Sequence, residues 1–200
     1  MSFFRESVLT ESKLYARIRD YEKDALVKFQ IESYWKKYKS YAPQNYLDKV
    51  QSNEYFHQRW WEMFLGVGLL NLNLNIKTST NDRGPDFEIN LPSQTIWLEA
   101  VAPKIGEGDG VVPELLGGVN KLPENEFLLR LTNSLNYKLE IYNEYKSKGI
   151  ISDNDYCIIA ISSCALNQYG KLMDFPAPVL LKVLAGVSYL VLSKKNNYVQ

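Results

Sequence analysis

The sequence predicts a mixed α/β fold, with helices packed against a sheet of the α+β type. Three consecutive segments have the pattern of short strands, at residues 69–77, 85–91 and 95–101. The first alternates leucine and isoleucine with asparagine and lysine, which is the period of a half-buried strand. Helical periodicity precedes the strands at 53–67 and follows them at 125–148. The short links between the strands predict an antiparallel meander.

A fourth strand is predicted at 156–162, where the sequence YCIIAIS is rich in β-branched residues. Its nearly continuous apolar character is typical of a strand in the middle of a sheet. Beyond it we expect a short helix at 178–184 and a strand at 187–192. Residues 198–200 have the pattern of a hairpin strand that is cut short, so we expect the natural chain to continue.

A helical arm is predicted in front of this α/β domain, over residues 10–41. Its apolar residues recur at intervals of three and four, as at Leu14, Ile18, Ala25 and Phe29. Pro43 and the polar residues after it separate the arm from the rest of the chain. We therefore expect two parts, a helical arm at 1–50 and an α/β domain at 51–200.

The composition excludes a strongly basic nucleic-acid-binding protein. Lysine and arginine total 23, aspartate and glutamate also total 23, and the formal net charge is zero. A local basic patch is still compatible with this balance. The segment YWKKYKSY at 34–41 interleaves bases with aromatics, which could stack on and steer a nucleic-acid strand. The favoured interpretation is a solvated helix end whose cations complement the helix dipole.

The sequence favours a cytoplasmic protein without a membrane partner. Residues 1–5 lead into a polar, charged helix rather than the apolar segment of a signal peptide. The longest apolar run, 178–193, contains Lys182 and is too short to span a bilayer. Cys157 and Cys164 fall in or beside the predicted fourth strand, where we expect reduced cysteines in the core.

Four charged residues stand in apolar surroundings, where a charged side chain requires a partner. Asp86 and Glu99 lie in the second and third predicted strands, among residues that favour burial. Glu62 interrupts the apolar surface of the preceding helix, and Lys138 lies on the flank of the apolar stripe of the following helix. A buried charge is costly unless it is paired or binds a metal ion. Asp86 and Glu99 are therefore the first candidates for a functional site, and Glu62 also requires an explanation.

In chain order, the predicted elements are a helix with Glu62, a strand, a strand with Asp86, a strand with Glu99, a helix with Lys138 and a strand. This order resembles the PD-(D/E)xK nuclease superfamily, whose restriction-endonuclease-like core runs αβββαβ. Pro85 and Asp86 match the PD of the motif, and Glu99 matches its second acidic residue. Glu62 matches the acid that many members carry on the helix before the first core strand. The resemblance covers the chain from about the start of that helix to the end of the fourth strand.

One position departs from the motif of this superfamily. The motif places a lysine two residues after the second acid, where this sequence has Val101. Some families carry the lysine on the following helix, which here indicates Lys138. Lys104 is the second candidate, although Pro103 is expected to turn the chain away, and Lys77 is a more distant one.

The resemblance implies a magnesium-dependent nuclease, with manganese as an alternative ion. Asp86, Glu99 and the carbonyl of Ala100 would ligate the ion, and Glu62 would hold a second ion or orient a water. Lys138 would position or deprotonate the attacking water and stabilise the transition state. The expected activity is the hydrolysis of phosphodiester bonds in DNA by an endonuclease.

Simpler roles stay open for several of these residues. Asp86 could cap a turn, Glu62 could pair with Arg59, and Glu88 is expected to form a salt bridge at the rim of the site. His57, the single histidine of the sequence, is expected to be structural. The departure from the motif also leaves open a catalytically inactive nuclease-fold protein that binds nucleic acid or a protein partner. Assembly as a homodimer is a further alternative.

Overall fold

The computed structural model describes residues 1–5, 10–79, 84–108, 111–113 and 123–166. The elements in these residues are α1 (Lys13–Asp20), a 3₁₀ helix (Glu22–Asp24), α2 (Ala25–Tyr38), α3 (Tyr46–Lys49), α4 (Phe56–Asn71), β1 (Ile76–Thr78), β2 (Phe87–Asn90), β3 (Thr95–Val101), α5 (Glu124–Ser147) and β4 (Tyr156–Ile161). The chain divides into two compact units. The first consists of Met1–Ala102 and Lys138–Ser162, and the second of Pro103–Tyr137 and Ser163–Gln200.

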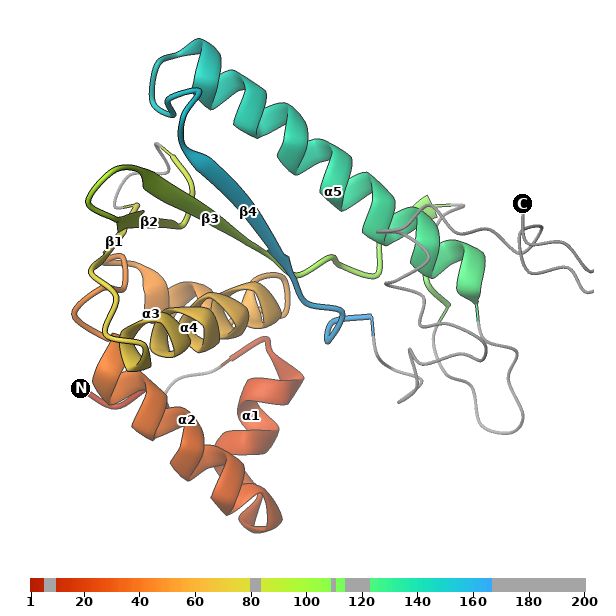
Figure 1. Ribbon diagram of the computed structural model, residues 1–200. Helices are drawn as coiled ribbons and strands as arrows, with labels where there is room; N and C mark the ends of the chain where they lie inside the picture. Colours follow the sequence, from red (N-terminus) through yellow and green to blue (C-terminus); the bar gives the residue numbers. More distant parts are fainter. Residues whose placement is uncertain (6–9, 80–83, 109–110, 114–122, 167–200) are drawn as a thin grey trace, which may run out of the picture. The chain divides into compact units, whose positions relative to one another are not determined.

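The first unit is built on a four-stranded mixed sheet with the strand order β1-β2-β3-β4. β1 pairs with β2, and β2 with β3, in antiparallel fashion, which confirms the predicted meander. β4 pairs with β3 in parallel, and these two strands run side by side in Figure 1. The chain is therefore a mixed α/β protein, as predicted. Its elements α4, β1, β2, β3, α5 and β4 follow one another in the predicted order.

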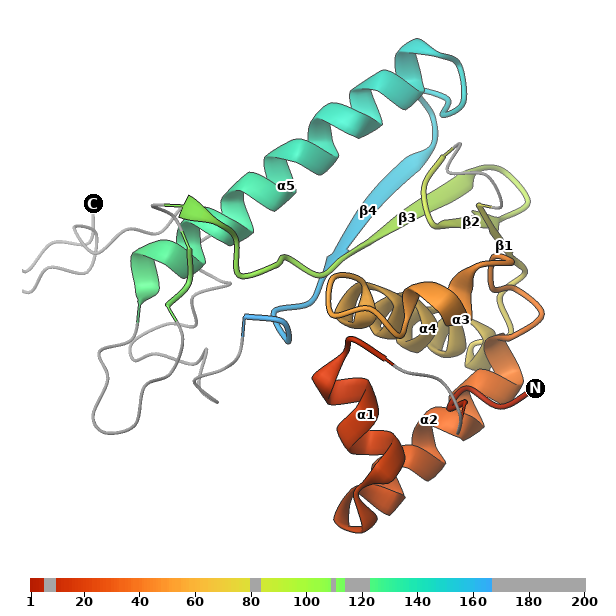
Figure 2. The ribbon, with the colours of Figure 1, turned by 180° about the vertical axis from the view of Figure 1, so that it is seen from behind.

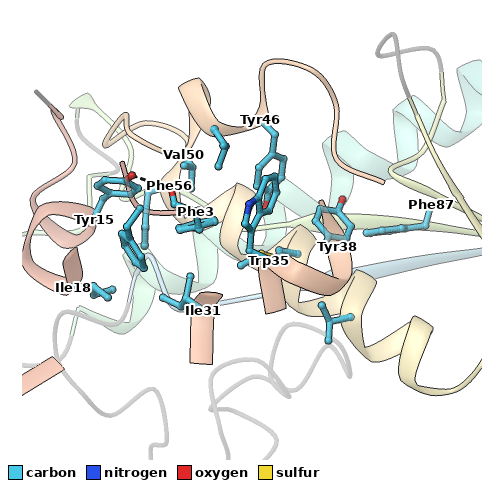
Figure 3. Close-up of a cluster of buried hydrophobic side chains, with 14 of the residues drawn as sticks. Phe3, Tyr15, Ile18, Ile31, Trp35, Tyr38, Tyr46, Val50, Phe56 and Phe87 are labelled. Atoms are coloured by element: carbon cyan, nitrogen blue, oxygen red, sulfur yellow. Dashed lines mark hydrogen bonds between the residues drawn. The ribbon is translucent and has the colours of Figure 1, made fainter. Parts of the chain in front are cut away.

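The core of the first unit lies between the sheet and the N-terminal helices. α4 packs against both β3 and α2, and the reverse view in Figure 2 shows it between the sheet and α2. Figure 3 shows the aromatic cluster in this space, where the rings of Trp35 and Tyr46 stack with their centroids 5.5 Å apart. The ring of Tyr38 contacts Phe87 of β2. Residues of α1 and α2 therefore share one core with the sheet.

The single helix predicted at 10–41 is wrong, because the chain breaks at Tyr21. This residue has extended backbone angles (φ −92°, ψ 117°), and a short 3₁₀ helix separates it from α2. The break allows α1 and α2 to contact each other, and α2 then presents a different face to the core. Ile18 is buried as predicted, but Ala25 is exposed and Phe29 is 74% exposed. The buried residues of α2 are Ile31, Trp35 and Tyr38.

The strand predicted at 69–77 is mostly helix and turn. α4 extends into this segment, and only Ile76–Thr78 forms β1. Asn73 lies just beyond the end of the helix in the left-handed conformation (φ 57°), which asparagine adopts more readily than most residues. The N–H of Leu74 then donates to the carbonyl of Leu69 at 3.2 Å. The alternation of leucine and asparagine thus spans a helix end rather than a strand.

The helix predicted at 125–148 is confirmed as α5. Its apolar stripe was expected to include Leu131, Leu139 and Tyr142; Leu131 and Tyr142 are buried, whereas Leu139 is exposed. Only 21% of the Lys138 side chain is exposed. Lys138 and Tyr142 are four residues apart and therefore lie on the same face of the helix. This orientation turns the lysine towards the sheet.

The strand predicted at 156–162 is confirmed as β4, although it lies at the edge of the sheet that the described residues form. Tyr156 and Ile158 are exposed. Cys157 and Cys164 are exposed as well, so the prediction that they are core residues is wrong. The helix, strand and hairpin segment predicted beyond residue 177 lie outside the described residues. Each helix in the described part of the chain is too short or too polar to cross a bilayer.

Candidate functional site

Asp86 and Glu99 lie next to each other where β2 begins. The register pairs Phe87 with Leu98, so the next step places Asp86 opposite Glu99. The N–H of Asp86 donates to Oε2 of Glu99 at 3.2 Å, and Oδ2 of Asp86 accepts from the N–H of Ala100 at 2.8 Å. Glu99 is only 7% exposed. Two carboxylates are thus brought together, and each is anchored by a main-chain amide across the sheet.

Lys138 reaches this pair of carboxylates from α5. Its Nζ donates to Oε1 of Glu99 in a largely buried ion pair. One turn further along the helix, Oη of Tyr142 lies 2.9 Å from the carbonyl oxygen of Ile158 and 3.2 Å from that of Trp97. Tyr142 therefore ties this part of α5 to β3 and β4, and the attachment keeps the ammonium of Lys138 at Glu99.

Glu62 comes from α4 and is paired within its own helix. It is 4% exposed. Its Oε2 accepts from Nη1 of Arg59 at 2.5 Å, and its Oε1 accepts from Nε2 of Gln58 at 3.0 Å. Arg59 in turn lies against the ring of Tyr46, 5.8 Å from its centroid. The pairing with Arg59, which the sequence left open as a simpler role for Glu62, is therefore present.

Gln58 connects α4 to the main chain of β3, and sequence reasoning missed it. Its Nε2 donates to the carbonyl of Ala100 at 2.9 Å, and its Oε1 accepts from the N–H of Ala102 at 2.9 Å. The one signal that could have found it is its position four residues before Glu62, on the same face of a helix. An uncharged glutamine beside the polar residues of a helix start does not otherwise stand out.

With all five of its charged side chains ionised, the cluster would carry more negative than positive charge. Three carboxylates (Glu62, Asp86 and Glu99) and two cations (Arg59 and Lys138) leave a formal sum of −1. Burial raises the pKa of Asp86 well above its usual range, and the charges of Glu62 and Glu99 add to this effect. Burial also raises the pKa of Glu62, although the charge of Arg59 opposes it. An additional cation would therefore be favourable at this position.

The other candidate residues have different surroundings. Lys77 pairs with Glu88 at 2.9 Å on the surface of the sheet, which confirms the rim salt bridge expected for Glu88. Lys104 belongs to the second unit. His57 packs against the ring of Phe56, and burial lowers the pKa of its imidazole. Lys138 is the lysine that the structure brings to Glu99.

The aromatic residues at 34–41 belong mainly to the core. Trp35 and Tyr38 are buried, and the ring of Tyr34 stacks on that of Trp60 with the centroids 5.9 Å apart. Such an arrangement leaves these rings little surface on which the bases of a nucleic-acid strand could stack. The interpretation of this segment as a stacking platform is therefore not favoured.

The oxygen donors of the cluster suit a magnesium ion. In the described residues, no group of three or more His, Cys, Asp or Glu side chains is arranged to hold a metal ion. Magnesium, however, keeps several waters and requires only one or two carboxylates from a protein. Asp86, Glu99 and the carbonyl of Ala100 supply oxygen donors of the type that such a site uses. Both oxygens of Glu62 are engaged by Gln58 and Arg59.

Comparisons with models of protein families, with curated proteins and with solved structures find no match to this chain. The distinguishing features of the cluster are two adjacent carboxyl groups, a third one nearby on α4, and a largely buried lysine from the next helix.

Proposed function

We propose that this chain is a magnesium-dependent endonuclease that hydrolyses phosphodiester bonds in DNA, with manganese as a substitute ion. The proposal takes α4-β1-β2-β3-α5-β4 as a restriction-endonuclease-like αβββαβ core. The antiparallel pairing of β2 with both β1 and β3, and the parallel pairing of β4 with β3, support this assignment. The proposed ligands are Asp86, Glu99 and the carbonyl of Ala100, and the proposed lysine of the site is Lys138.

The ion pair between Lys138 and Glu99 is the observation that carries the proposal. The motif requires a lysine near its second acidic residue, and Val101 cannot supply one. Lys138 stands 39 positions after Glu99, and its ammonium nevertheless contacts that carboxylate. Lysine is almost never fully buried unless it is paired. A largely buried lysine beside two carboxylates therefore supports a role in chemistry at this point.

Each residue would contribute in a way that its contacts allow. When bound, a magnesium ion would act as a Lewis acid that neutralises charge on a phosphate and makes water more acidic. Asp86 and Glu99 would hold the ion, and their main-chain hydrogen bonds fix the direction of the two carboxylates. Nζ of Lys138 would donate a hydrogen bond to the attacking water or to a phosphoryl oxygen, where negative charge develops.

A second candidate function is binding of nucleic acid or of a protein partner without cleavage. One observation favours it: both oxygens of Glu62 and Oε1 of Glu99 already accept hydrogen bonds from side chains of the same chain. Carboxylates whose oxygens are already engaged by the same chain can have a purely structural role in a nuclease-like fold that does not cleave. It would then support binding of a partner elsewhere on the unit.

Cleavage assays with matched variants separate the two functions. Supercoiled plasmid and single-stranded DNA are incubated with the purified chain in magnesium, in manganese and in EDTA. We expect ion-dependent cleavage by the wild type, and a loss of about 100-fold or more in Asp86→Asn and Glu99→Gln. Glu88→Gln is the control, since Glu88 lies on β2 but pairs at the surface with Lys77.

Two results decide against the endonuclease. Equal cleavage by the wild type and by both site variants would show that the activity comes from elsewhere. Binding of DNA or a protein by the wild type, with no cleavage under any ion condition, would favour the second candidate.

A further inference from the structure

We infer that Gln58 is a positioning residue for the Ala100 end of the site, and that Glu62 acts through Gln58 rather than as a ligand of a second ion. The consequence for catalysis rests on the proposed function. The hydrogen bonds that carry the inference do not depend on it, and they can be tested separately.

Gln58 continues the hydrogen bonding of β3 beyond the start of β2. β2 begins at Phe87, opposite Leu98, so the main chain of Ala100 and Ala102 extends past the end of its partner strand. Nε2 of Gln58 donates to the carbonyl of Ala100, and Oε1 accepts from the N–H of Ala102. A primary amide presents a donor and an acceptor side by side, as a peptide group does. The Gln58 side chain thus takes the place of the main-chain groups that a longer β2 would present to β3.

The same stretch of main chain carries the candidate ligands. The N–H of Ala100 donates to Oδ2 of Asp86, and Glu99 is the residue directly before it. Gln58 and Asp86 therefore hold the two polar groups of one residue, the carbonyl and the N–H of Ala100. If the amide of Gln58 is removed, the carbonyl loses its fixed direction, and the attachment of Asp86 becomes looser.

Glu62 favours the same orientation of the Gln58 amide as the main chain of Ala100 and Ala102 does. One hydrogen of Nε2 goes to the carbonyl of Ala100 and the other to Oε1 of Glu62. A flipped amide would place its oxygen against the Glu62 carboxylate and against that carbonyl, and acceptors do not bond to acceptors. Arg59 engages Oε2 of Glu62 and balances its charge. Glu62 is therefore committed to Gln58 and Arg59.

The test compares Gln58→Met with Gln51→Met. Gln51 is a buried glutamine whose Nε2, like that of Gln58, donates to a main-chain carbonyl, here that of Leu47. The measurements are the affinity for magnesium and manganese by calorimetry and the hydrogen exchange of the Ala102 amide by NMR. We expect Gln58→Met to lower the ion affinity about tenfold or more and to speed exchange at Ala102. Gln51→Met is expected to change neither.

A double variant, Arg59→Met with Glu62→Gln, removes the charge pair but leaves an amide oxygen that can accept from Gln58. We expect it to lose less ion affinity than Gln58→Met and to keep the protection of the Ala102 amide. If Gln58→Met does not fold, this double variant still tests whether Glu62 is itself an ion ligand.

Three results would overturn the inference. The first is an unchanged Ala102 exchange rate in Gln58→Met. The second is equal ion affinity in Gln58→Met and Gln51→Met. The third is a double variant that loses as much affinity as Asp86→Asn while Ala102 stays protected, because Glu62 would then be a ligand itself. If the wild type binds no divalent ion, the proposed function fails, whereas the exchange measurement still tests the role of Gln58.

Discussion

The N–H of Asp86 donates to Oε2 of Glu99, while the ammonium of Lys138 holds Oε1 of the same carboxylate. One side chain is thus fixed from two directions, by the main chain beside β2 and by a helix that follows much later in the sequence. Because this carboxylate is buried, we expect substitutions of the charges around it to change the stability of the fold and, under the proposed function, the rate of cleavage. Both quantities can be measured with single substitutions.

The raised pKa of the Asp86 carboxyl group predicts how the stability of the fold changes with pH. Burial and two neighbouring carboxylates raise its pKa in the folded chain, whereas the unfolded value is about 3.9. Protonated Asp86 therefore contributes stability that is complete below the unfolded pKa and is lost as the pH rises through the folded pKa. In EDTA, we expect Asp86→Asn to melt at a higher temperature than the wild type at pH 7, with a difference that grows from pH 4 upward. Thermal unfolding followed by circular dichroism measures this, and a variant that melts lower at pH 7 would contradict it.

Replacing Lys138 tests whether the lysine from α5 supplies what Val101 does not. We expect Lys138→Met to lower the rate of DNA cleavage about 100-fold or more, since groups that assist proton transfer contribute at least that much. Single-turnover cleavage at saturating magnesium is the measurement. Lys77→Met is the matched control, because Lys77 forms an exposed pair with Glu88. Equal rates for the two variants would exclude Lys138 from the reaction.

Two glycines of α4 offer a test of the packing that supports the site. A Cβ on Gly66 would lie 2.5 Å from Cε2 of the buried Tyr38 and 3.2 Å from Cε1 of Phe87, whereas a Cβ on Gly68 would meet no described atom within 4 Å. We expect Gly66→Ala to cost about 1–3 kcal/mol in the free energy of unfolding through overpacking. Gly68→Ala should instead add up to about 1 kcal/mol, because alanine favours a helix. Urea denaturation compares the two, and a stabilised Gly66→Ala would refute the packing.

Much of the sheet could be predicted from the sequence, because its strands have clear ends. β3 has the predicted bounds, since Pro92 and Ser93 precede it and Pro103 follows it closely. The break at Tyr21 could not be predicted, because apolar residues recur at helical spacing on both sides of it. The strand predicted at 69–77 failed because leucine alternating with asparagine also fits a helix that ends with a left-handed asparagine.

The candidate site was predictable where a charge interrupts an apolar run. Glu62, Asp86 and Glu99 stood out in this way, and the structure brings them into one cluster with Lys138. Gln58 carries no charge, and its importance depends on where β2 begins relative to Ala100. Such a relationship between a side chain and a strand end arises only when the chain is folded.

Titration with magnesium tests the central claim, that Asp86 and Glu99 form a cation site, most directly. Calorimetry is carried out on the wild type, on Asp86→Asn and on Glu88→Gln, each checked for folding by circular dichroism. We expect saturable binding by the wild type and by Glu88→Gln, and loss of that binding in Asp86→Asn. A wild type that binds no magnesium, or an Asp86→Asn variant that binds it equally well, would contradict the claim.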